Sequence, residues 1–548
     1  MQFFSPTNIN MYIAIALSVI NGVLLCFASY KFFQIIQLTG YRVKGYFLWL
    51  KDTKAKYIFR IFMLAFLSVT CSVVCNVLFD MFDSNYLYSY IGLIFYFYFS
   101  IVFINNLYSA PKKVPLKNTA RMSRLNIALF LFISGITFIL IAVFTELGIY
   151  SPVFGVFKFS VICLTPLLLP ILVPIVHLVM VPIEKLIAQR YILEAKVHLK
   201  HRPELIKIGI TGSYGKTSTK YMLNSILSKK YNVCMTPHSF NTMTGLSKVV
   251  NNYLTKDNQI LIAEMGARNV GDIKKLTDFI NPKYAIITNI GSQHMLSFGS
   301  EENIEKTKFE LIEGLPEDGF AVFFGENEGC ARMYEKCPCS KEIVGDALNS
   351  KIRASNIKTS TKGTTFTLTV DGNDYNFSTK LIGKHNVNNI LLCVAMALKL
   401  DLTMDEIKTA VAELNQVPHR LEIKENNGVT IIDDSYNSSV EGIEAALDVL
   451  SKFHSTKIVI TPGLVELGKL EKEENTNFGE KMAKVADYVI IVNQVNMAEI
   501  KQGLENKKFD MEKVYCVETL NDAKKKLQEI VKPGCTVLFE NDLPDNYM

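Results

Sequence analysis

Acidic residues are scarce in the first third of this 548-residue chain. Residues 1–183 contain four, Asp52, Asp80, Asp83 and Glu146, against thirteen lysines and arginines. The rest of the chain is slightly acidic, because these 183 residues have a formal charge of +9 and the whole chain has +6. A slightly acidic soluble part does not favour a basic nucleic-acid-binding surface, so we expect no nucleic-acid partner.

Paired cysteine motifs are also missing. The eleven cysteines are scattered or lie in apolar runs, and the one cluster, at 330–339, lacks the C-x2-C pairs of a zinc ribbon. We therefore expect reduced cytosolic thiols rather than a disulfide framework. Low-complexity disorder is excluded as well, because 49% of the residues are hydrophobic and can form a large core.

Long apolar stretches, in contrast, are abundant near the N-terminus. Five are long enough to cross a bilayer, which takes about 20 helical residues; they are 11–30, 57–79, 86–108, 125–145 and 155–181. Six basic residues lie between the first and second stretches and five between the third and fourth, whereas the other two connections have none. The positive-inside rule then predicts a multi-pass cell-membrane protein with an outside N-terminus, a transmembrane domain over 1–183 and cytoplasmic catalytic domains.

Three prolines, Pro166, Pro170 and Pro174, lie four residues apart in the last stretch. Each removes a backbone donor, so this helix needs neighbours that satisfy the freed carbonyls and should be kinked and packed against protein. Lys158 and His177 lie in or near it, and an ionisable group within a membrane is a functional candidate. Either they take part in lipid handling or they snorkel to the interface; the sequence favours the second interpretation.

A candidate phosphate-binding loop follows a basic connector helix at 184–203. A buried strand at 205–210 leads into Thr-Gly-Ser-Tyr-Gly-Lys-Thr-Ser at 211–218, and helical periodicity follows. The glycines let backbone N–H groups face a phosphate, Lys216 would neutralise it, and Thr217 would reach Mg2+. The strict Walker pattern is not met, because Ile210 stands in place of its first glycine.

Two further strands end in polar residues. Glu264 follows a strand at 259–263, where a carboxylate would hold the nucleotide's Mg2+, and the strand at 284–288 delivers His294 to the same edge. The alternative for His294 is an ordinary surface-loop histidine. Strands and helical segments alternate from 429 to 539, which predicts a second parallel α/β domain, and 364–379 alternates around Asp371 and Gly372 as a hairpin would.

Eight ordered motifs resemble the Mur ligase family of ATP-dependent amide ligases, and most closely its D-alanyl-D-alanine-adding members. The motifs are TGSYGKTS at 211–218, AEMGARNVGDI at 263–273, TNIGSQHMLSFGS at 288–300, IEKTKFEL at 304–311, GKHNVNN at 383–389, HRLE at 419–422, DDSYNSS at 433–439 and VELG at 465–468. The resemblance implies a P-loop central Mur ligase domain at 204–414 and a Rossmann-like C-terminal α/β domain at 415–548, behind an α-helical transmembrane bundle of about five helices. It covers none of residues 1–183.

The resemblance also implies a role for each matching position. The residues that would bind the nucleotide are Gly212, Ser213, Gly215, Lys216, Thr217, Ser218, Asn386, Asn389, Arg420 and Asp434. Mg2+ would be held by Thr217, Glu264, His294 and Lys308, and catalysis would use Lys216, His294 and Lys308. Lys308 matches a lysine that CO2 carbamylates in the family, although composition alone favours a solvated lysine on a charged helix. Substrate contacts would come from Asn241, Thr242, Asn437 and Glu466.

The implied reaction explains why cations, rather than a nucleophilic side chain, are needed. A carboxylate oxygen first takes the γ-phosphoryl group of ATP, giving an acyl phosphate, which an amine then attacks. Two anions must meet in the first step, so a lysine and Mg2+ are required. Water would hydrolyse the intermediate, so we expect the last domain to close over the site.

Three departures from the family pattern bear on the substrate. The N-terminal domain that grips a UDP-sugar is replaced by the membrane half, and Ser239 and Thr242 stand where asparagines are usual. The segment 540–545, Glu-Asn-Asp-Leu-Pro-Asp, replaces a basic Lys-Gly-Ser-Arg stretch. We therefore expect a membrane lipid to carry the saccharide acceptor and an amino acid or dipeptide to supply the amine. The alternatives are a polyglutamate-type ligase, a P-loop ATPase coupled to transport, and a catalytically silent scaffold.

Overall fold

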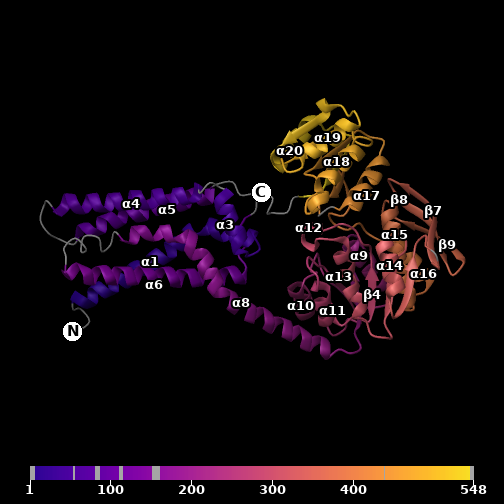
Figure 1. The fold of residues 1–548 in the computed structure, drawn as a ribbon, viewed down its shortest axis with the longest axis horizontal. Coiled ribbons are helices and arrows are strands. Elements are labelled where there is room, and N and C mark those ends of the chain that lie inside the picture. The colour runs from indigo at the N-terminus through magenta and orange to yellow at the C-terminus, as the bar shows by residue number, and fades with distance from the viewer. Residues whose placement is uncertain are drawn as a thin grey trace. The chain divides into compact units, whose positions relative to one another are not determined.

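The computed structural model describes residues 6–52, 56–80, 87–109, 115–150, 161–347, 349–436 and 439–542. Contacts divide the chain into two units, the first built on residues 1–188 and the second on residues 189–544 (Figure 1). The first unit is helical, and the second contains two sheets covered by helices. This is the predicted fold class, a helical region followed by two α/β domains.

The first unit consists of apolar helices. They are α1 (Pro6–Ala28), α2 (Tyr30–Leu38), α3 (Val43–Asp52), α4 (Lys56–Asp80), α5 (Leu87–Ser109), α6 (Ala120–Tyr150), the 3-10 helix η2 (Val161–Leu168) and α8 (Leu169–Lys200). Three helical segments are long and apolar enough to cross a membrane, namely Met11–Ala28, Ala120–Phe144 and Ile162–Lys200. The other two expected spans fall on shorter apolar segments, Ile58–Val74 and Leu93–Asn106. The number of crossings and their orientation stay predictions.

The proline-rich helix is packed against its neighbours as expected. Thr165 Oγ1 donates to the carbonyl of Ile162, three residues earlier in the 3-10 helix, at 2.6 Å. Pro174 frees the carbonyl of Pro170, which accepts from the hydroxyl of the buried Tyr46, on α3, at 2.9 Å. The local change to a 3-10 helix over Val161–Leu168 lies at Pro166. A side chain of α3 thus satisfies the backbone carbonyl that Pro174 releases.

Two buried polar residues in this unit have hydrogen-bond partners within the protein. Asn21 of α1 is fully buried, donates to Thr137 and Thr165 at 2.9 and 3.0 Å, and accepts from Tyr96 at 2.6 Å. His177 is buried, and its Nε2 lies 3.0 Å from the carbonyl of Tyr41, so it has a structural partner. Lys158 lies outside the described residues.

The central domain is a nine-stranded sheet in the order β2-β3-β1-β4-β5-β6-β7-β8-β9, parallel up to β7 and antiparallel beyond it. The strands are β1 (Ile206–Thr211), β2 (Val233–Met235), β3 (Ile260–Glu264), β4 (Tyr284–Ile287), β5 (Phe320–Phe324), β6 (Ser340–Val344), β7 (Ile352–Ser360), β8 (Gly363–Val370) and β9 (Asn373–Thr379). The β8–β9 hairpin turns at Asp371 and Gly372, which both have positive φ, as the alternation predicts.

Helices cover both faces of this sheet (Figure 1). One core contains apolar residues of α9 (Lys216–Leu227), α15 (Lys384–Lys399) and α16 (Met404–Ala412). The other contains residues of α10 (Met243–Asn252), α11 (Asp272–Ile280), α13 (Glu301–Glu313) and α14 (Glu328–Lys336), together with the end of α8. The short helix α12 (Met295–Phe298) precedes α13.

The C-terminal domain is a six-stranded sheet in the order β10-β11-β15-β12-β13-β14, parallel except for the β10–β11 pair. Its strands are β10 (Glu422–Asn426), β11 (Val429–Asp434), β12 (Lys457–Thr461), β13 (Tyr488–Val492), β14 (Val514–Val517) and β15 (Thr536–Glu540). The helices are α17 (Val440–Ser451), η3 (Gly468–Leu470), α18 (Glu471–Met482), α19 (Met497–Asn506), η4 (Met511–Lys513) and α20 (Leu520–Ile530). Two apolar cores fill the opposite faces of the sheet.

Candidate active site

The phosphate loop joins β1 to α9 and depends on two glycines. A Cβ atom at Gly212 would lie 2.0 Å from Thr288 Oγ1, so only glycine lets the chain pass this close to the loop after β4. Gly215, at the start of α9, has φ +81°, which glycine adopts without strain. Lys216 Nζ donates to the carbonyls of Gly212 and Ser213 at 2.6 and 2.8 Å, so its ammonium group lies against the loop.

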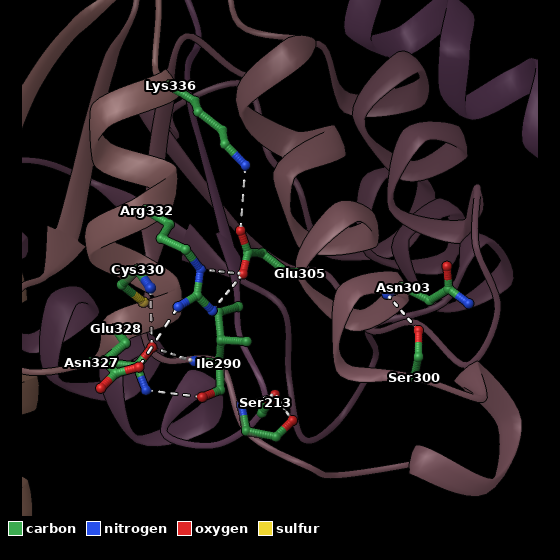
Figure 2. A network of polar contacts seen from close by, with 11 residues as sticks. Ser213, Ile290, Ser300, Asn303, Glu305, Asn327, Glu328, Cys330, Arg332 and Lys336 are labelled. Carbon is green, nitrogen blue, oxygen red and sulfur yellow. Dashed lines mark hydrogen bonds and ion pairs between the residues drawn. The ribbon is translucent and has the colours of Figure 1, made fainter.

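A second set of contacts fixes the neighbouring loop after β4 (Figure 2). Ser213 Oγ lies within 3.0 Å of both the amide and the carbonyl of Gly291. Asn327 bonds the amide and carbonyl of Ile290 at 3.1 and 2.9 Å and also caps α14 through the amide of Cys330. One asparagine therefore holds the loop and the helix behind it together.

The α13 and α14 helices are tied by a surface ion-pair network. Glu305 accepts from the guanidinium of Arg332 at 2.8 Å, and Lys336 lies 3.7 Å from the same carboxylate (Figure 2). Each exposed pair contributes little alone, and buried Leu311 and Ile312 hold α13 against the sheet. That position matters because α13 carries Lys308.

Sheet register brings Glu264 to the phosphate loop. Ile210 pairs with Glu264 across β1 and β3, so the carboxylate emerges where the loop begins. Glu264 Oε2 accepts from Thr217 Oγ1 at 3.1 Å and from Lys220 Nζ at 2.9 Å, and Oε1 accepts from Asn241 at 3.0 Å. Burial favours a higher pKa for Glu264, but Lys220 and Lys216 outweigh it and hold the pKa below its ordinary value. The carboxylate is therefore ionised at neutral pH.

Lys220 is a functional candidate that sequence reasoning missed. Its side chain is fully buried and forms an ion pair with Glu264, which is equally buried. The only signal was its position four residues after Lys216, on the same helix face. Periodicity could not distinguish this position from an ordinary surface lysine, because the partner lies 44 residues later.

A cavity of about 460 Å³ opens beside these groups. Most predicted site residues line it, from the loop, from β3 and α13, and from the C-terminal domain; they are Ser213, Gly215, Lys216, Thr217, Ser218, Asn241, Thr242, Glu264, His294, Lys308, Asn386, Asn389, Arg420 and Asp434. The cavity also contains Arg268, Asp272, His385 and Tyr436, which the sequence did not single out. Burial lowers the pKa of Lys216 to about 8, although Glu264 opposes this shift.

Lys308 is buried, with only 4% of its surface exposed. The interpretation of a solvated lysine on a charged helix is therefore wrong. Burial lowers its pKa to about 7, and Lys216 adds to the shift. A large fraction of this lysine is consequently a neutral amine at neutral pH, which is the form that reacts as a nucleophile.

His294 is bonded to Glu466 of the C-terminal domain, with Nδ1 2.7 Å from Oε2. The amide of Leu296 also donates to the carbonyl of Glu466 at 3.2 Å. Both His294 and Glu466 have positive φ, at 61° and 66°, a conformation that costs a non-glycine residue about 1–3 kcal/mol unless its surroundings hold it. Glu466 does not line the cavity and is bonded to His294; its predicted contact with substrate stays a prediction.

Three other predicted site residues make hydrogen bonds within the central domain. Asn389 Oδ1 accepts from Thr219 at 3.3 Å beside the phosphate loop, and Asn386 donates to the carbonyl of Ile382 at 2.9 Å. Thr242 caps α10 by accepting from the amide of Gly245. Asn437 lies outside the described residues.

The C-terminal domain contributes a cationic and aromatic cover. The guanidinium of Arg420 lies 4.4 Å from the ring centroid of Tyr436, whose hydroxyl donates to Ser239 Oγ at 2.6 Å. Burial raises the pKa of Asp434 to about 6, although Arg420 opposes this, and its Oδ1 accepts from the amide of Leu421.

Comparison with known proteins supports the Mur ligase assignment of both the central and the C-terminal domain. The model of the Mur ligase middle domain matches residues 210–397, and that of the Mur ligase glutamate ligase domain matches residues 419–540. The chain is 30% identical over 337 residues to UDP-N-acetylmuramoyl-tripeptide--D-alanyl-D-alanine ligase of Bacillus subtilis, covering 61% of this chain and 72% of that one. The corresponding ligase of Escherichia coli is 31% identical, covering 53% and 65%.

Solved structures agree with this assignment. MurF of Thermotoga maritima, solved in complex with ADP, superposes with a TM-score of 0.58 at 26% identity, covering 66% of this chain and 81% of that one. MurF of Acinetobacter baumannii, with a TM-score of 0.59, 24% identity and coverage of 65% and 77%, shares the fold. The chain belongs to the Mur ligase family of ATP-dependent peptide ligases, within which it is similar to MurF.

Proposed function

We propose that this protein is a membrane-anchored amide ligase that phosphorylates an acceptor carboxylate with ATP and then joins it to an amino acid or dipeptide. The observation that carries the proposal is the cavity in which Lys216, Glu264 and Lys308 meet. Two anions, a carboxylate and a triphosphate, have to approach each other in the first step, and this cavity supplies the ammonium group of Lys216 and, at Glu264, a carboxylate that would hold Mg2+ to offset their repulsion.

The loop and its lysines fit the triphosphate end of the nucleotide. Backbone N–H groups at the start of α9 and the ammonium of Lys216 would bind the β and γ phosphates. Ser213 and Ser218 would add hydroxyl donors, and Asn386 and Asn389 would lie toward the base. Arg420 and Tyr436 would cover the nucleotide from the C-terminal domain and exclude water, which an acyl phosphate requires.

Mur ligases use Mg2+ with ATP, and the donor set here fits that ion. Glu264 is ionised and Thr217 offers a hydroxyl at the same place, 3.1 Å from the carboxylate. Oxygen donors of this kind are what Mg2+ prefers. His294, which the family resemblance assigns to the metal, would add a nitrogen donor. When bound, the ion would neutralise charge developing on the transferred phosphoryl group. Lys220 would keep Glu264 in place whether or not the ion is present.

Lys308 would carry a carbamate. Its neutral amine would attack CO2 and lose a proton, and the resulting carbamate would place an anionic, metal-organising group where the amine lies. The lowered pKa of Lys308, about 7, supports this role because a protonated ammonium group has no lone pair to attack CO2. Asp272 and Arg268 line the same cavity and would lie toward the acceptor.

Glu466 would act on the metal site through His294. We expect Glu466→Ala to raise the Mg2+ concentration needed for half-maximal activity by about 10–100-fold, the usual effect of removing a partner that orients a ligand. Titration of activity against Mg2+ measures this. Glu473→Ala, at an exposed position on α18, is the matched control. If Glu466→Ala behaves like that control, the contact has no role in metal binding.

We further propose a cell-wall or surface-glycan precursor, carried on a membrane lipid, as the acceptor. Apolar helices occupy the part of the chain that precedes the central domain, so lipid contacts would replace those of a soluble sugar-binding domain. The acidic segment that begins at Glu540 favours an amine with more positive charge, or with no free carboxylate, than D-alanyl-D-alanine has.

The test is product formation by the full-length protein in lipid nanodiscs. Saccharide acceptors with a free carboxylate are supplied either on a polyprenyl-type lipid or on UDP, with ATP, Mg2+ and a panel of amino acids and dipeptides. Mass spectrometry of the product and release of phosphate are followed together. We expect an amide product from the lipid-linked acceptor, with one phosphate released per bond. Preferred use of the UDP-linked acceptor would refute the lipid proposal, and amide formation without ATP would refute the ligase mechanism.

A further inference from the structure

The C-terminal part of α8, residues 183–200, has an apolar stripe that the described protein leaves uncovered. We call this segment the α8 extension. Its exposed apolar side chains have 42–65% of their surface accessible and recur at helical spacing; they are Ile183, Leu186, Ile187, Leu193 and Val197. At 100° per residue they lie within about one third of the helix circumference. A stripe of this size on a soluble surface needs an explanation.

The opposite side of the α8 extension is attached to the central domain. Ala195 and Leu199 are buried in its core, and Ile192 packs against the same core. Tyr191 adds two hydrogen bonds, from its hydroxyl to Asn252 at 2.9 Å and from Asn251 to its carbonyl at 3.0 Å. Residues 189–200 of the extension therefore belong to the same unit as the central domain, and Leu193 and Val197 lie on the face turned away from that domain.

The length of the apolar segment places this stripe beyond the hydrocarbon of a membrane when the crossing begins at η2. The eight residues of η2, at about 2.0 Å each, and roughly the first ten residues of α8, at about 1.5 Å each, together span the roughly 30 Å of a hydrocarbon core. Pro182 lies at the start of the extension, where its missing donor weakens the helix and permits a bend. The segment thus leaves the membrane and has room to turn along its surface.

Charge on the α8 extension favours a lipid surface over a protein partner. Lys185, Lys196 and Lys200 are exposed along one edge of the stripe, and Arg190 lies within it, against a single exposed acidic residue there, Glu194. Glu184 is engaged by Arg124 at 2.7 Å. Basic residues beside an apolar stripe are typical of helices that lie in the interface of an anionic membrane. Pairing with a second copy would bring these lysines together.

We propose that the α8 extension lies in the headgroup region of an anionic membrane, with its apolar stripe toward the acyl chains. The central domain, attached to its other face, is thereby held at the membrane surface. This inference deepens the proposed function, because it rests on membrane anchoring and explains how a cavity built for ATP would receive an acceptor carried by a lipid.

The first experiment measures depth by fluorescence. Tryptophan is introduced by Leu193→Trp in the full-length protein in nanodiscs, and brominated lipids serve as quenchers; the signal of the parent chain, from Trp49, is subtracted. Val270→Trp, at an exposed apolar position of the same domain, is the control. We expect brominated lipids to reduce the added Leu193→Trp emission about twofold, to quench it less in neutral than in anionic lipid, and to spare the control.

The second experiment separates this inference from the proposed function. Leu193→Gln combined with Val197→Gln should lower ligation of a lipid-linked acceptor about tenfold and leave ATP turnover with a short soluble acceptor unchanged. Quenching without any use of lipid-linked acceptor would support the membrane contact and refute the acceptor assignment. Absence of quenching would overturn the membrane contact. If two copies of the chain then crosslink at residue 193, the stripe is a dimer interface instead.

Discussion

Lys216→Ala is expected to abolish both phosphate release and amide formation, by at least about a hundredfold, because it removes a cation that would bind the transferred phosphoryl group. The side chain lies against the phosphate loop and lines the cavity, while the glycines that shape the loop are unaffected by the change. The measurement is product formation by the full-length variant in nanodiscs, with circular dichroism to verify folding.

The control for Lys216→Ala is Lys229→Ala, which removes a partly exposed cation just after the same helix. It should retain close to full activity, because its surface ion pair with Glu413 is worth at most about 1 kcal/mol. Comparable ligation by the Lys216→Ala variant and the parent would eliminate the loop as the phosphate site. Lys229→Ala thus tests whether the loss of one positive charge is enough by itself to lower activity.

Lys308→Ala should cause a loss of similar size, and small carboxylates such as formate or acetate should partly restore activity. The deletion leaves space beside Lys216 and Glu264 in the cavity, where a free carboxylate would substitute for the carbamate. Lys306→Ala, at an exposed position two residues earlier on the same helix, should have little effect. Failure of every carboxylate to restore activity, with the variant folded, would argue against an anionic group at this position.

The pH dependence follows from the same lysine. Burial lowers the pKa of Lys308 to about 7, so the ammonium form predominates below that pH and the neutral amine above it. Formation of the carbamate, and with it the dependence of activity on bicarbonate, should therefore increase as the pH rises from 6 to about 8. NMR with ¹³C-labelled bicarbonate would detect the carbamate directly, and the signal should be absent from the Lys308→Ala variant.

The sequence was most informative where function depends on local structure. The phosphate loop lies between a strand and a helix that are adjacent in the chain, so Gly215, Lys216 and Thr217 were identifiable from their order alone. Glu264 was also placed correctly at a strand end. The contact between Glu264 and Thr217 depends on β3 pairing with β1, which short-range patterns do not encode.

Other residues could not be found this way, because their partners are distant in the chain. Lys220 forms a buried ion pair, but it lies on a helix whose sequence pattern is that of an ordinary amphipathic helix. Glu466 meets His294 from 172 residues away, through a backbone conformation that no pattern of residue types indicates. The edge strand β10 was also missed, since it is largely exposed and contains charged residues at most positions.

The hydrogen bond from Tyr46 to the carbonyl of Pro170 constrains how the chain can be shortened. These residues are 124 positions apart, and the carbonyl has no helical donor because Pro174 follows it. A fragment that begins after α3 would lack the donor and leave this carbonyl unsatisfied away from water, at a cost of several kcal/mol. A shortened chain that is meant to keep α8 intact therefore has to keep α3 as well.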